Sequence, residues 1–145
     1  MTTKELQENL VKAMRQWQKI EDASVTSTGR IIEQTENPLI RMVMEIIQHD
    51  SKMHYRVQEA VAASLESQPV SLTPEELGDV WEAIEKHIKI EKEMAGFVNE
   101  TLATLKGRKM MVQEYLLNYL KTDEEKHDAL LEQLENFKRG IYPYA

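Results

Sequence analysis

The chain has 145 residues, a formal net charge of −7 and no cysteine. Its length and its hydrophobic content of 41% fit one folded domain with a core. Because the chain has no cysteine, disulfides, thiolate zinc sites and iron–sulfur clusters are excluded. The negative net charge disfavours nucleic-acid partners. No apolar run is long enough to form a membrane-spanning helix.

Four long helices are predicted, because good helix formers fill most of the sequence and the breakers fall in three places. The breakers lie before Pro38, between Ser67 and Pro74, and around Gly107. Thr73 is a strong helix start, because its hydroxyl can cap the first amides and Pro74 fits the first turn. The helices are expected at roughly 3–35, 38–66, 74–105 and 108–139, which predicts an all-α four-helix bundle in a single domain, 1–145.

Acidic and histidine side chains interrupt the apolar face of every predicted helix. Apolar residues recur at three- and four-residue spacing, which marks the face that packs into a core. Burying ionisable groups there is unfavourable unless a partner or a metal ion compensates. The interrupting residues, in chain order, are Glu21, Asp50, His54, His87, Glu91, Asp123, Glu124 and His127.

These groups lie at matched distances from the predicted turns. Glu21 and Asp50 lie 15 and 14 residues from Glu36, and the counts agree similarly at the two later turns. In antiparallel hairpins, such counts place the carboxylates in one layer and the three histidines about one turn away. Carboxylates and imidazoles that converge in this way are typical metal ligands. The sequence therefore predicts a metal site inside the bundle.

Glu124-x-x-His127 has the spacing of the ligand unit in dinuclear sites carried by helical bundles. On this unit the chain resembles the ferritin-like di-iron carboxylate superfamily, particularly its small rubrerythrin-like members. In that family, the first and third helices each give a Glu, and the second and fourth each give Glu-x-x-His. Carried over to this chain, the resemblance implies the ligands Glu21, His54, Glu91, Glu124 and His127.

The chain departs from the family pattern in its second helix and in one connection. Ser51 stands three residues before His54, where a Glu is expected, so Asp50 would serve in its place. His87 is an additional candidate ligand or partner of a ligand. Family bundles join the second and third helices by a long crossover, whereas a connection of about seven residues favours antiparallel neighbours. Both topologies stay open at this point.

The resemblance implies two iron ions and a ferroxidase- or peroxidase-like oxidoreductase. Such a protein would oxidise Fe(II), or reduce dioxygen or peroxide with electrons from an external redox partner. Zinc and manganese are possible alternatives to iron, because they bind similar ligands. Two alternatives remain, namely a non-catalytic metal-binding or metal-sensing bundle and a metal-free interaction bundle with a polar core. A homodimer is a generic expectation, and the absence of an apolar signal core at the N-terminus predicts a cytoplasmic protein.

Overall fold

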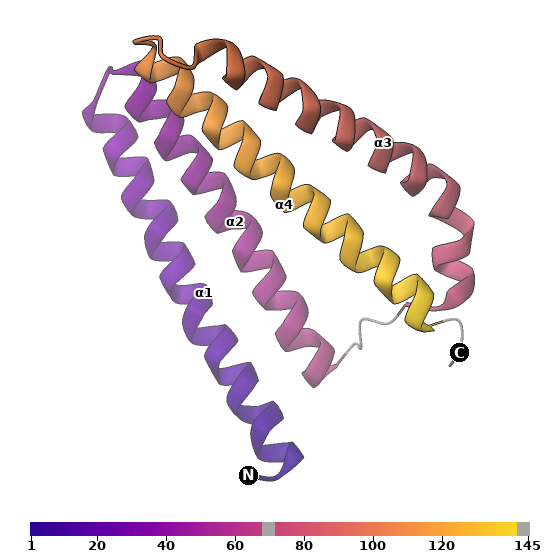
Figure 1. The fold of residues 1–145 in the computed structure, drawn as a ribbon. Helices are drawn as coiled ribbons and strands as arrows, with labels where there is room; N and C mark the ends of the chain where they lie inside the picture. The colour runs from indigo at the N-terminus through magenta and orange to yellow at the C-terminus, as the bar shows by residue number, and fades with distance from the viewer. Residues whose placement is uncertain (68–71, 142–145) are drawn as a thin grey trace. The chain divides into compact units, whose positions relative to one another are not determined.

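The computed structural model describes residues 1–67 and 72–141. It contains α1 (Thr3–Gln34), α2 (Pro38–Glu66), α3 (Pro74–Leu105) and α4 (Met111–Ile141), shown in Figure 1. The prediction of an all-α chain with four long helices, as in a four-helix bundle, is confirmed, and the described residues include no strand. No helix in this part of the chain is long and apolar enough to cross a membrane.

The chain divides into two compact units, Met1–Ser71 and Leu72–Ala145, and each unit is a hairpin of two helices (Figure 1). In the first hairpin, Gln18 of α1 bonds to Glu59 of α2, and Gln48 of α2 bonds to the carbonyl of Val25 of α1. The two helices are therefore antiparallel. The connection at 68–71 lies outside the described residues, so the single domain and the topology of that connection stay predictions.

Side-chain caps fix the helix starts that the sequence predicted. Thr73 and Glu76 form a capping box at α3, in which the Thr73 hydroxyl accepts from the Glu76 N–H and the Glu76 carboxylate accepts from the Thr73 N–H. Asn37 caps α2 by accepting from two backbone N–H groups. Caps of this kind each stabilise a helix by about 1 kcal/mol.

The fourth helix begins at Met111, three residues later than expected. Gly107 has φ +77°, a left-handed conformation that ends the helical path of α3. Arg108 then donates its backbone N–H to the Leu105 carbonyl at 2.9 Å, which closes a turn before α4 starts. The prediction of a start at residue 108 was wrong because it located the glycine but not the length of the turn that it makes.

The interface between α1 and α2 is unusually polar. Among its residues with less than a tenth of their surface exposed are Gln18, Glu21, Thr28, Ser51 and Gln58, with Ala62 at one end. The Ser24 and Ser51 hydroxyls share a hydrogen bond of 2.8 Å across it. Large apolar side chains of these two helices, such as Trp17 (50% exposed), are not covered within the hairpin.

The interface between α3 and α4 is more apolar and contains one buried acid. Leu77, Trp81 and Val98 are buried on α3, and Glu91 lies among these positions with only 6% of its surface exposed. Lys138 of α4 places its ammonium 4.3 Å from the centre of the Trp81 ring. The helices of this hairpin are therefore also antiparallel, with Glu91 near the middle of their contact.

Candidate metal centre

Three side chains of the second hairpin converge on one point. Glu91 comes from α3, whereas Glu124 and His127 lie three residues apart on α4 and face the same way, as helical geometry requires. One ligand atom from each residue lies within 4.8 Å of the other two. This is the largest group of candidate metal ligands in the described residues, and it matches the predicted Glu-x-x-His unit plus one acid from the neighbouring helix.

Glu91 is held between two histidines. Its Oε1 lies 2.9 Å from His87 Nε2, and its Oε2 lies 3.2 Å from His127 Nδ1. The carboxylate is buried, while the His87 side chain is 53% exposed and lies at the margin of the group. His87 therefore orients Glu91 from the solvent side, and His127 joins Glu91 to the ligands on α4.

Glu124 presents a buried carboxylate oxygen that lacks a hydrogen-bond donor among the protein groups described. Its Oε2 is buried, and His127 Nδ1 lies 3.8 Å away, beyond hydrogen-bonding distance. A hydrogen bond between Glu91 and Glu124 can form only when one of the two carboxyls is protonated; this bond raises the pKa of Glu124 and lowers the pKa of Glu91, and burial raises the pKa of Glu124 further. The two carboxyl groups are therefore close enough to affect each other's pKa, and a proton or a cation between them would relieve their repulsion.

Asp123 lies on the other side of the His127 ring. Its Oδ2 is 3.5 Å from His127 Nε2, and its Oδ1 is 2.8 Å from Lys126 Nζ. Because Nδ1 faces the two glutamates, Nε2 is left for Asp123. A carboxylate in this position commonly fixes the orientation of a metal-ligating imidazole. Asp123 therefore lies beside His127 but outside the group of Glu91, Glu124 and His127. Its role as a metal ligand stays a prediction.

The first hairpin brings together fewer of the predicted ligands. His54 Nδ1 lies 3.4 Å from Glu21 Oε1, and the Gln58 amide donates to the same oxygen at 3.2 Å. Asp50 was expected to replace the missing glutamate of α2, but it forms no hydrogen bond or ion pair with the described chain, and Ser51 occupies the buried position. One residue along a helix turns a side chain by about 100°, so Asp50 and Ser51 point in different directions. The role of Asp50 as a ligand stays a prediction.

Sequence reasoning missed Gln58, which is 4% exposed and lies beside Glu21. The prediction counted only ionisable residues as interruptions of the apolar face. Gln58, which follows His54 by four residues, lies on the same side of α2 and was the signal that it overlooked. The eight predicted residues divide between the two hairpins, and their union in one centre stays a prediction.

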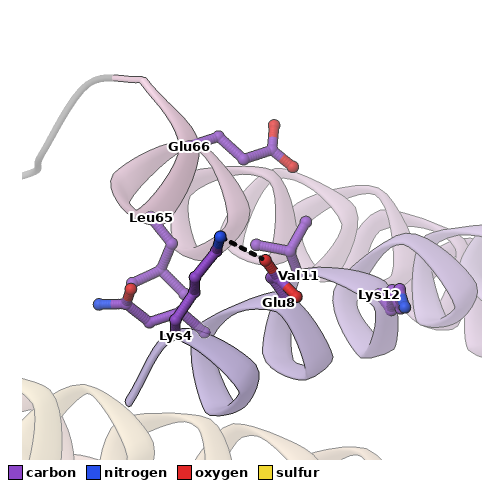
Figure 2. Close-up of a pocket in the computed structure, with 7 residues that line it drawn as sticks. Lys4, Glu8, Val11, Lys12, Leu65 and Glu66 are labelled. Carbon is purple, nitrogen blue, oxygen red and sulfur yellow. Dashed lines mark ion pairs between the residues drawn. The ribbon is translucent and has the colours of Figure 1, made fainter. Parts of the chain in front are cut away.

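A hollow at the open end of the first hairpin offers no comparable set of ligands (Figure 2). Its Glu8 carboxylate is paired with Lys4 at 3.9 Å, and Glu66 is paired with Arg15 at 3.2 Å. These charges are balanced by exposed partners, so the hollow does not need a cation.

In comparisons with protein-family models, with curated proteins and with solved structures, nothing matches this chain.

Proposed function

We propose that this protein binds a divalent transition-metal ion through Glu91, Glu124 and His127. The observation that carries this proposal is the buried Glu124 oxygen without a donor, which faces a second carboxylate and an imidazole. Two carboxylates in a poorly solvated place repel one another unless a proton or a cation lies between them. A divalent ion would neutralise both charges and would also use the imidazole nitrogen.

The ligand types narrow the choice of metal. Two carboxylates and one imidazole suit Fe(II), Mn(II) and Zn(II), whereas a site for Ca²⁺ or Mg²⁺ would be built from oxygen ligands. Iron is the metal that the ferritin-like resemblance implies. Three protein ligands are fewer than a closed structural zinc site uses, which favours a site that a small molecule can reach.

With iron bound, the metal would supply one-electron chemistry toward dioxygen or peroxide. The residues of the chain would hold the ion, with Glu91 and Glu124 balancing its charge and Asp123 fixing the His127 ring through Nε2. We propose an iron-dependent oxidoreductase as the leading activity on this basis. A non-catalytic metal-binding or metal-sensing role is the second candidate. It is favoured because the proposed ligands come from both α3 and α4, so that a bound ion would stabilise the packing of one helix on the other.

Anaerobic calorimetric titration with Fe(II) tests the metal-binding proposal. Wild-type protein and the Glu93→Gln variant are expected to bind iron equally, because Glu93 lies on α3 but is exposed. Glu91→Gln is expected to lose the tight binding event, since it removes the central carboxylate. Equal binding by Glu91→Gln and wild type, or no binding by wild type, would overturn the proposal.

A stopped-flow measurement of Fe(II) oxidation separates the two candidate activities. Oxidation by dioxygen or peroxide that is faster than in buffer, and that is lost in Glu91→Gln but kept in Glu93→Gln, supports the oxidoreductase. Stable iron binding with no acceleration of oxidation supports the sensing role instead.

A further inference from the structure

The turn between α3 and α4 gathers cations in a chain whose net charge is −7. Lys106, Arg108 and Lys109 lie within four residues, and all three are exposed. None of them forms an ion pair with the described residues. No acid occurs from residue 101 to residue 113, so this stretch has a charge of +3. The three cations form the basic tip of the second hairpin.

Backbone hydrogen bonds hold the basic tip at the end of the hairpin where α3 and α4 are joined (Figure 1). Gly107 has its left-handed φ of +77°, and Lys106 donates its N–H to the Ala103 carbonyl at 3.4 Å. The N–H of Arg108 closes the turn on the Leu105 carbonyl, and α4 begins three residues later. The cations are therefore concentrated at one end of the hairpin and are not spread along a helix face.

Exposed apolar side chains follow these cations directly in the sequence. Met110, Met111 and Val112 are 39%, 83% and 47% exposed. Tyr115 is 54% exposed and lies one turn after Met111, on the same face of α4. Cations beside exposed apolar residues are typical of segments that lie in a membrane interface, where the cations meet anionic headgroups and the apolar side chains enter the acyl boundary. A tyrosine fits the same boundary, because its ring is apolar and its hydroxyl is polar.

We propose that the basic tip docks the second hairpin onto a membrane surface that contains anionic lipids. The three cations contact the headgroup phosphates, and Met111 and Tyr115 enter the interface beside them. Any polyanion would attract the cations, but a nucleic acid or an acidic peptide offers no apolar phase for Met111, which favours the lipid surface. This inference goes beyond the proposed metal binding and uses none of its ligands.

The acids of the second hairpin are too distant from the basic tip to cancel its attraction to an anionic surface. Glu100 and Glu114 are the nearest in sequence, and they leave the stretch 100–114 with a positive charge. The next acids are Glu93 on α3 and Asp123 on α4, each 13 residues from the turn at 106–110. Along a helix this separation is about 20 Å, which is more than twice the screening length of about 8 Å at physiological salt.

Co-sedimentation of the full chain with lipid vesicles tests this inference. Vesicles of phosphatidylcholine with about one third phosphatidylglycerol are compared with vesicles of phosphatidylcholine alone. A chelator is present throughout, so that a metal ion cannot bridge the protein to the lipid. Wild type is expected to bind only the anionic vesicles and to be released as the salt concentration rises, because salt screens the contacts of the cations.

Variants locate the binding surface. Each cation near an anionic surface contributes about fivefold to binding, so the triple variant Lys106→Gln, Arg108→Gln, Lys109→Gln should bind the anionic vesicles about a hundredfold more weakly. The matched control changes three exposed lysines of the first hairpin and so alters the net charge equally: Lys12→Gln, Lys19→Gln, Lys52→Gln. Met111→Ser should weaken binding about tenfold, and it keeps the test decisive if the triple variant does not fold by circular dichroism.

Equal binding of wild type to both kinds of vesicle, or no binding to either, would overturn the proposal. The same follows if the triple variant binds as well as its control, or if Met111→Ser binds as well as wild type. Binding to polyglutamate or to a nucleic acid, but not to anionic vesicles, would also overturn it and would assign the cations to a soluble polyanion. Metal binding is measured separately by calorimetry, so these outcomes leave the proposed function intact.

Discussion

Replacing Glu124 by Gln should stabilise the metal-free protein while abolishing metal binding by Glu91, Glu124 and His127. At pH 7 the wild type places two carboxyls together, and the shared hydrogen bond raises the pKa of Glu124. A glutamine of nearly the same shape removes one charge and can donate an N–H to Glu91. A net hydrogen bond of this kind contributes about 1 kcal/mol, which corresponds to a rise in Tm of about 2–4 °C for a chain of this length.

The order of stability should reverse when metal is added. A ligand at about 100 times its Kd stabilises the wild type by about 2.7 kcal/mol, and the variant, which lacks the Glu124 carboxylate, should gain none of this. Urea denaturation with and without Zn²⁺ measures both effects, and Glu125→Gln, an exposed neighbour on α4, is the matched control. A variant that is less stable than wild type without metal, or that keeps the full gain with metal, would refute the reasoning.

Three further predictions follow from the same contacts. Because the pKa of Glu124 is raised, the stability linked to its protonated form is fully present below the ordinary pKa of 4.5 and is lost as pH rises through the folded pKa. The advantage of Glu124→Gln should therefore shrink as denaturation is measured at successively lower pH, down to the ordinary pKa. A constant advantage down to that pH would contradict the raised pKa of Glu124. Asp123→Asn should lower the affinity of the proposed metal site about tenfold without unfolding the protein, as measured by calorimetry. Unchanged affinity would show that Asp123 does not position His127. Thr73→Ala should destabilise the second hairpin by about 1 kcal/mol in urea denaturation, because α3 loses its capping box, and no change would show that the cap contributes nothing.

The helices were predictable because their signals are local. Asn37, Thr73 and Gly107 each end or begin a helix through groups within a few residues, so the sequence alone locates them. The length of the turn after Gly107 depends on how α3 meets α4. The predicted start of α4 was therefore three residues too early.

The ligands of the second hairpin were predictable for a similar reason. Glu124 and His127 share a face of α4 because of their spacing, and counting from the turn brings Glu91 to the same depth. In the first hairpin, counting along the chain could not decide between Asp50 and Ser51, because adjacent residues have similar depth but different direction. Only the packing of α1 on α2 shows that Ser51 is buried and that Gln58 lies beside Glu21.

The most direct test is anomalous diffraction at the zinc edge from a crystal of the full chain grown with Zn²⁺. The account predicts a strong peak within about 2.0–2.2 Å of a carboxylate oxygen of Glu91, a carboxylate oxygen of Glu124 and Nδ1 of His127. Clear density for these three side chains with no peak between them, under conditions in which zinc binds elsewhere on the protein, would contradict it.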